Sequence, residues 1–177
     1  MPNIVRRYLE DFLQSLELEK GASERTIRNY RFYLLRFFDW TKIVSPGEIT
    51  PERVKQFRLQ LNRFENPRGG TLKRATQNYH LIALRAFLKY LAKVDVSAMS
   101  ADKISLAKQE ERQVSVLEPE ELDRFLSAPL AHNETSVTAI RDKAILETLF
   151  STGLRVSELA GLRRDQLNLK KDEHTVR

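Results

Sequence analysis

Apolar residues recur every three or four positions through most of the first 93 residues, and this period is the strongest constraint on the fold. Residues three and four apart lie on one face of a helix, so the pattern predicts amphipathic helices. Four are expected, over residues 4–18, 24–40, 51–64 and 73–93. Gly21 is predicted to end the first helix, and Ser23 and Thr50 to cap the second and third. The pattern therefore predicts a mainly α chain that begins with a four-helix domain.

The periodicity lapses after this domain and then returns. We expect a linker over residues 95–116, between a helical domain at 1–94 and a second domain at 117–177. In the second domain a short helix should begin near 117–122, and a longer one over 137–151 should bury apolar residues. A short helix over 156–162 and the start of a strand near residue 174 complete the prediction. The residues expected to be buried on the longer helix are Ile140, Ala144, Ile145 and Leu149.

Charge divides between the two halves. Residues 1–100 hold 18 Lys and Arg against 10 Asp and Glu, whereas residues 101–177 hold 12 against 14. A basic helical domain favours a polyanionic partner, most often nucleic acid, because its cations neutralise phosphates. The alternative is an ordinary solvated surface.

The composition also excludes several classes of protein. The chain has no cysteine, which excludes disulfide scaffolds, thiol catalysis and cysteine-based zinc sites. His80 is isolated in the sequence and predicts no metal site. No apolar run reaches the roughly 18 residues of a membrane span, and no apolar signal segment opens the chain. A cytoplasmic protein is expected.

The most informative stretch is Thr-Gly-Leu-Arg-Val-Ser-Glu-Leu at residues 152–159. Gly153 permits the backbone reversal that ends one helix and presents Arg155 at the start of the next. A guanidinium is always charged, and its fork of donors matches phosphate oxygens. Glu158 lies one helical turn further on and is expected to hold Arg155 in place. The alternative is an exposed surface ion pair, which contributes only a few tenths of a kcal/mol.

This stretch resembles the first catalytic box of the tyrosine recombinases, the phage-integrase or Xer-like enzymes. Residues 162–169 fit the same family pattern, and so does the order of a basic four-helix domain, a linker and then the box. The resemblance implies a SAM-like core-binding domain followed by the first helices, and the start of a β-hairpin, of an α+β catalytic domain. It also implies that Arg155 is catalytic and that Glu158 supports it.

The family cuts and rejoins DNA strands through a 3′-phosphotyrosyl intermediate, which needs neither metal nor cofactor. The resemblance therefore implies a double-stranded DNA recombination site as partner. It also implies that the chain assembles on DNA with full-length recombinase, as a homo- or hetero-tetramer.

Two parts of the family's chemistry are missing from the sequence. All five tyrosines precede residue 91, so none occupies the place of the nucleophile. His174 and Arg177 spell the family's His-x-x-Arg pattern, but they follow Arg155 too closely, which indicates a chance match. We therefore expect the N-terminal portion of a recombinase, inactive by itself. Its second domain should expose apolar surface and be loosely folded.

By the same resemblance, the second and fourth helices face the major groove of DNA. Arginine and lysine would contact phosphates, and asparagine and threonine would reach base edges. The residues expected to contact DNA are Arg25, Arg28, Asn29, Lys73, Arg74, Thr76, Asn78 and Tyr79. Ordinary solvated helix faces are the alternative.

Two other functions compete with a recombinase. One is a non-catalytic DNA-binding module that occupies recombination sites. The other is a helical protein-interaction domain without a nucleic-acid partner. A strongly salt-dependent affinity for DNA would exclude the second of these.

Overall fold

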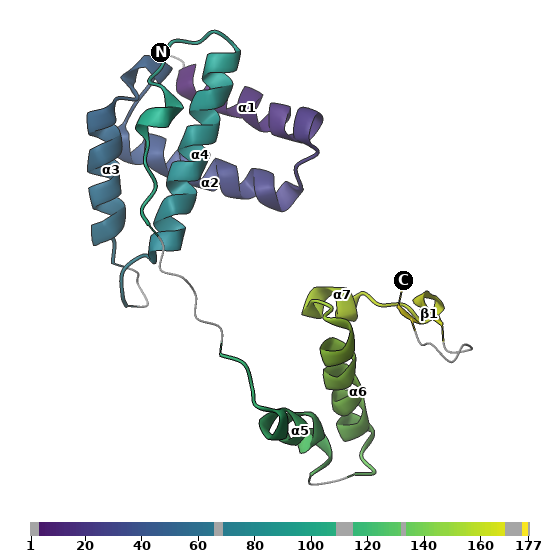
Figure 1. The fold of residues 1–177 in the computed structure, drawn as a ribbon. Coiled ribbons are helices and arrows are strands. Elements are labelled where there is room, and N and C mark those ends of the chain that lie inside the picture. Colours follow the sequence, from purple (N-terminus) through teal and green to yellow (C-terminus); the bar gives the residue numbers. More distant parts are fainter. Residues whose placement is uncertain (1–3, 66–68, 109–114, 132–133, 169–174, 177) are drawn as a thin grey trace. The chain divides into compact units, whose positions relative to one another are not determined.

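The computed structural model describes residues 4–65, 69–108, 115–131, 134–168 and 175–176. The chain forms two compact units, Met1–Glu111 and Arg112–Arg177, which we call unit 1 and unit 2 and describe separately (Figure 1). The described residues are mainly helical, and the only sheet among them has two strands of two residues each. The predicted mainly α fold is confirmed. No helix within the described ranges is long and apolar enough to cross a membrane.

The described part of unit 1 contains four α-helices, as the periodicity predicted. The hairpin of the first two crosses the other two (Figure 1). They are α1 (Ile4–Lys20), α2 (Glu24–Thr41), α3 (Pro51–Arg63) and α4 (Arg74–Lys93).

Local chemistry at the helix ends matches the sequence prediction. The Ser23 side-chain oxygen accepts a hydrogen bond from the Thr26 N–H at 3.3 Å, and the Thr50 hydroxyl accepts one from the Arg53 N–H at 3.3 Å. Each bond satisfies a backbone donor that the first turn of a helix leaves unpaired. Gly21 follows α1 with φ of +57°, a left-handed conformation that glycine adopts without a Cβ clash.

The core of unit 1 is aromatic and aliphatic. Phe12 of α1 packs edge-on against Phe87 of α4 with ring centroids 5.7 Å apart, and Phe87 also contacts Phe38 of α2. Burying side chains of this size is the main source of stability for a small helical domain. The five positions predicted to face inward on α4 are all buried: Leu81, Leu84, Phe87, Leu88 and Leu91.

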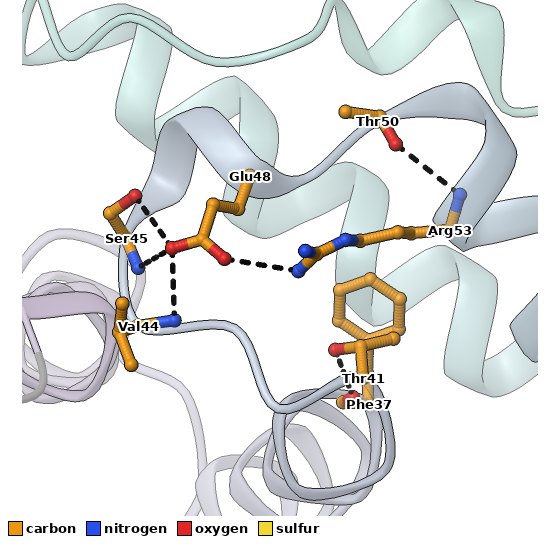
Figure 2. A network of polar contacts seen from close by, with 7 residues as sticks. All are labelled: Phe37, Thr41, Val44, Ser45, Glu48, Thr50 and Arg53. Atoms are coloured by element: carbon orange, nitrogen blue, oxygen red, sulfur yellow. Dashed lines mark hydrogen bonds and ion pairs between the residues drawn. The ribbon is translucent and has the colours of Figure 1, made fainter.

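Glu48 organises the connection between α2 and α3 (Figure 2). It ends the 3-10 helix η1 (Pro46–Glu48), and its carboxylate accepts hydrogen bonds from the Val44 N–H at 3.3 Å and the Ser45 N–H at 3.1 Å. The Ser45 hydroxyl and the Arg53 guanidinium also donate to it, each at 3.1 Å. Burial by itself would raise the pKa of Glu48, but these hydrogen bonds to the ionised form lower it below its usual value. The connection is therefore fixed by one carboxylate.

Residues 95–107 differ from the linker expected over 95–116. They contain the short 3-10 helix η2 (Ala101–Lys103) and pack against the bundle, with Ala101 and Ile104 buried in its core. Unit 1 accordingly extends to Glu111. The sequence prediction missed this packing because the apolar residues of this segment show no sustained helical period.

Unit 2 is built from short elements, which Figure 1 shows in green and yellow. The two strands pair antiparallel, with Leu167 opposite Val176 and Asn168 opposite Thr175. In chain order the elements are α5 (Pro119–Ser127), η3 (Ala128–Leu130), α6 (Val137–Thr152), α7 (Val156–Ala160), η4 (Arg164–Gln166), β1 (Leu167–Asn168) and β2 (Thr175–Val176).

Unit 2 buries little of its apolar surface. Leu126 is the only buried hydrophobic residue among its described positions. The expectation that α6 buries Ile140, Ala144, Ile145 and Leu149 is wrong for this chain: Ile140 is 53% exposed, and Leu149 is only half-buried. The reason is that the main neighbours of α6 within the described residues, η3, α5 and α7, are short and do not cover its faces. The expected exposure of apolar surface is confirmed.

Candidate functional site

The Thr-Gly-Leu-Arg-Val-Ser-Glu-Leu box spans the turn between α6 and α7. Gly153 ends α6 with φ of +67°, and its N–H donates to the Leu149 carbonyl at 3.0 Å. This left-handed residue reverses the backbone, as the sequence predicted. Arg155 then occupies the N-cap position of α7, in extended conformation. The box thus places one arginine at the start of a short helix.

Glu158 holds Arg155 through both of its carboxylate oxygens. The Arg155 guanidinium donates to Oε1 at 2.8 Å, and the Arg155 backbone N–H donates to Oε2 at 2.8 Å. Both hydrogen bonds lower the pKa of Glu158, and the one from the backbone N–H has the larger effect. The carboxylate therefore fixes both the backbone and the head of Arg155, which is the arrangement predicted from their spacing.

Arg155 remains accessible despite this pairing, with 81% of its side chain exposed. Its guanidinium is free on other sides to meet a phosphate oxygen, because a guanidinium carries five N–H donors. An exposed ion pair one turn apart on a helix is also an ordinary surface feature. The geometry alone suits both of the alternatives that the sequence left open.

A hollow of about 560 Å³ lies beside this pair. Its full lining is Thr152, Leu154, Ser157, Glu158, Gly161, Leu162 and Gln166.

The structure places most of the expected DNA contacts on accessible positions of unit 1. On α2, Arg25, Arg28 and Asn29 are exposed. Lys73 and Arg74 are exposed at the start of α4, Tyr79 is exposed one turn further along, and Thr76 is half-buried.

The basic members of this set are unpaired. Arg6, Arg31, Arg53 and Lys93 of unit 1 form ion pairs with carboxylates. In contrast, no ion pair within the described part of the chain involves Arg25, Arg28, Lys73 or Arg74. Other exposed basic residues, such as Lys55, share this property. Their charge is available to an external anion.

Asn78 is a correction to the predicted set. We expected it on the outer side of α4, but it is only 2% exposed. Its amide nitrogen donates to the Ala107 carbonyl at 2.8 Å, and its amide oxygen accepts from the Ala107 N–H at 3.0 Å. Both polar atoms of the amide thus form hydrogen bonds within the protein, so Asn78 is not available to contact a base edge. Helical spacing predicted an outward position for Asn78 because a periodic pattern within α4 does not reveal that the segment up to Ala107 packs on that side of the helix.

A hollow of about 480 Å³ between α2 and α4 was not predicted. Asn29 and Tyr79, two of the expected DNA contacts, lie in its wall. The Tyr33 and Tyr79 rings are nearly parallel, with an interplanar angle of 11° and centroids 6.4 Å apart. The lining is Thr26, Asn29, Tyr30, Tyr33, Tyr79, Ile82 and Ala83. The spacing of these positions on each helix is the signal that could have indicated a shared face.

His80 lies in the core of unit 1. It is 2% exposed, and its ring lies near Tyr33 and Phe57. Burial lowers the pKa of His80, with a smaller lowering from the charge of Arg36. No group of three or more His, Asp or Glu able to hold a metal occurs among the described residues. His174 and Arg177, which we interpreted from the sequence as a chance match to His-x-x-Arg, lie outside the described residues.

Two family models match the chain. The model for the N-terminal SAM-like domain of phage integrase matches residues 9–94, and the model for the phage integrase family matches residues 115–177. Together they take in most of the sequence, one on each unit.

Known proteins resemble the chain over nearly its whole length. Tyrosine recombinase XerD of Chlorobaculum tepidum is 37% identical over 97% of this chain and 55% of its own length. Tyrosine recombinase XerC of Thermodesulfovibrio yellowstonii is 33% identical over 96% of this chain and 54% of its own length. The crystal structure of XerA recombinase aligns with a TM-score of 0.44 and 22% identity, covering 97% of this chain and 58% of that one. The chain spans about half the length of the two XerD and XerC relatives.

Proposed function

Because the chain belongs to the phage integrase family, the tyrosine recombinases, we propose that it serves site-specific DNA recombination. In this proposal the parent enzyme cuts and rejoins DNA strands through a 3′-phosphotyrosyl intermediate. The 177 residues supply the DNA-binding domain and the first catalytic box. The nucleophile is none of the five tyrosines present, which all lie in unit 1.

The observation that carries the catalytic part is the exposed guanidinium of Arg155, held by Glu158 at 2.8 Å within the family's motif. Arg155 contacts the scissile phosphate and stabilises the charge that builds up as the phosphorus is attacked. Glu158 is a positioning residue, because it bonds to Arg155 rather than to the phosphate. Neither metal nor cofactor takes part, since the phosphotyrosyl bond conserves the energy of the broken phosphodiester.

Unit 1 supplies the DNA contacts in this proposal. The exposed, unpaired Arg25, Arg28, Lys73 and Arg74 bind phosphates. Asn29, Thr76 and Tyr79 lie on the same two helices, and they contact bases or sugars. Asn29 and Tyr79 flank the hollow between α2 and α4, so base contacts would centre there. We extend the proposal to a tetramer of like or mixed recombinase protomers on two duplexes, in the cytoplasm.

DNA binding is tested first, with the 177-residue chain and a mixed-sequence duplex, by fluorescence anisotropy at several salt concentrations. The affinity should fall steeply with salt, and the R25Q/R28Q double variant should reduce the slope of log K against log salt by about 1.8, for two lost phosphate contacts. Lys55→Gln, on the exposed side of α3, is the matched control and should leave the slope unchanged. A salt-independent or absent affinity would favour the protein-interaction alternative.

Catalysis is tested in a chimaera that joins this chain to the remaining part of the Chlorobaculum tepidum relative. Arg155→Ala should lower strand cleavage at least about a hundredfold while DNA affinity stays within about twofold. Arg141→Ala removes an exposed, ion-paired arginine of α6 and should leave cleavage unchanged. Equal cleavage by wild type and the Arg155 variant would support the alternative of a non-catalytic DNA-binding module.

The 177-residue chain alone gives a further test. On a duplex nicked so that cleavage becomes irreversible, it should bind without forming a covalent adduct. An adduct trapped on this chain would show that one of its own tyrosines is the nucleophile.

A further inference from the structure

The connector after α4 runs back along the helix that precedes it (Figure 1). The Val96 N–H donates to the Leu91 carbonyl at 2.9 Å, near the end of α4. Ala101 and Ile104 then insert into the core, and Arg58 of α3 donates to the Ser105 hydroxyl at 3.4 Å. Ala107 reaches Asn78, in the second turn of α4. We call residues 96–107 the strap.

Asn78 makes the last bond between the strap and the bundle within the described residues. Its amide pairs with both the N–H and the carbonyl of Ala107, at 3.0 and 2.8 Å. Asparagine suits this position because its side chain carries a donor and an acceptor side by side, like a peptide group. A backbone segment docked on a helix has no helical partner of its own, and leaving its polar groups buried and unpaired would be costly. Asn78 replaces that missing partner.

We propose that Asn78 is a positioning residue that fixes where the chain leaves unit 1. If the whole strap detached, the connector to the N-cap of α5 at Glu118 would begin at the end of α4 and could extend roughly 80 Å at about 3.4 Å per residue. With the strap docked, the span begins at Ala107 and can extend roughly 40 Å. Docking of the strap therefore halves this reach, and Asn78 secures its last residue in addition to the buried Ala101 and Ile104.

The position of Asn78 ties this function to DNA. Its neighbour Tyr79 is exposed on the face of α4 that we propose to contact DNA, whereas Asn78 faces the strap. The helix that meets DNA thus also holds the connector to the catalytic box. This part of the inference rests on the proposed function, because it assumes that both units engage one duplex. The docking of the strap does not depend on that assumption.

Hydrogen exchange tests the docking without DNA. Asn78→Ala removes both hydrogen bonds between Asn78 and Ala107 without adding charge. Ala107→Pro removes the backbone N–H that donates to Asn78 and leaves the sequence of α4 unchanged. In each variant, exchange of the Lys103 and Ile104 amides should rise at least tenfold, while the α1 amides stay within twofold of wild type. Asn62→Ala, at an exposed asparagine of α3, and Leu106→Pro, at a residue whose N–H makes no hydrogen bond among those described, are the controls. Unchanged exchange in both test variants would overturn the proposal.

Spin-label distances test the reach. The chain has no cysteine, so Lys89→Cys on α4 and Thr138→Cys on α6 introduce one labelling site in each unit. Releasing the strap by Asn78→Ala or Ala107→Pro should broaden the distance distribution and extend it to longer values, whereas Leu106→Pro should not. Distributions that superimpose on wild type would overturn the proposal.

DNA affinity tests the link to the proposed function. Doubling a tether lowers effective concentration by roughly threefold, so the strap variants should bind a duplex more weakly than wild type, by at most about threefold, the value for complete release of the strap. An unchanged affinity alongside a broadened distance distribution would overturn the link to DNA. Failure of the wild-type chain to bind DNA would instead count against the proposed function and would leave the exchange and distance tests of the strap valid.

Discussion

Helices α1 and α6 are nearly equal in length, 17 and 16 residues, yet they are stabilised differently. In unit 1, α1 buries Val5, Leu9, Phe12, Leu13 and Leu16 against the other helices of the bundle. In unit 2, α6 has no buried residue, and Val137, Ile140 and Phe150 at its surface are exposed. The difference teaches that an apolar sequence makes a helix part of a core only when a second surface covers it.

The two units also differ in the kind of site that they carry. The proposed DNA contacts lie on helices fixed by a packed aromatic core. Arg155 is the N-cap of a five-residue helix in a unit with one buried hydrophobic residue among its described positions, and Glu158 orients it. Rigid packing supports the first site, whereas local hydrogen bonds support the second.

Truncating one large apolar side chain in each unit tests most directly whether the two units are stabilised differently. Phe87→Ala, at a fully buried ring, should destabilise unit 1 by about 3–5 kcal/mol, through lost burial and a cavity between α1, α2 and α4. Ile140→Ala should change stability by less than about 1 kcal/mol because its side chain is already half in solvent. Trp40, the chain's only tryptophan, reports on unit 1 in denaturant unfolding, and circular dichroism reports on both units. Similar losses for both variants would contradict the difference.

Amide exchange sharpens the same comparison without any substitution. Amides of α6 should exchange at least about a hundredfold faster than those of α4, because local opening of α6 uncovers little additional apolar surface. Mass spectrometry of peptides from the intact chain measures both helices in one sample. Equal protection of residues 117–162 and 4–93 would show that unit 2 is stabilised by contacts other than burial.

The hydrogen bonds accepted by Glu48 should contribute more to the stability of unit 1 than is usual for a partly exposed carboxylate. Glu48→Gln replaces a carboxylate that accepts four hydrogen bonds and should cost unit 1 about 1–2 kcal/mol. Glu52→Gln, in the exposed first turn of α3, is the control and should change stability by less than about 0.5 kcal/mol. The midpoint of Trp40 unfolding measures both variants. Equal midpoints would show that the connection between α2 and α3 does not depend on Glu48.

The smallest expected effect is a pH dependence confined to unit 1. Burial lowers the pKa of His80 in the folded state, so the unfolded chain binds a proton first as pH falls. Stability should be fully present above about pH 6.5 and decline by at most about 1.4 kcal/mol per pH unit until the lowered folded pKa is reached. His80→Leu should abolish this part of the slope in Trp40 unfolding curves between pH 5 and 8. A slope shared by that variant would assign the pH dependence to carboxylates.

Local signals explain what could be predicted of the fold. Ser23, Thr50 and Gly21 act within one turn of chain, and each has the expected role. The inward positions of α4 followed from spacing because the whole bundle covers one side of that helix. Asn78 broke the pattern because a segment some 30 residues later covers a second side. The spacing of Arg155 and Glu158 predicted their pairing because both lie on one helical turn.

The sequence by itself determined the four helices of unit 1, the caps of α2 and α3, the glycine-arginine box and the family to which the chain belongs. These features depend on residues a few positions apart, where backbone preference and helical period act directly. Only the tertiary structure decided that residues 96–107 dock on the bundle, that Asn78 faces inward and that Tyr33 and Tyr79 flank a hollow. These outcomes depend on which segments far apart in the sequence pack together. A local pattern of apolar and polar residues does not specify those contacts.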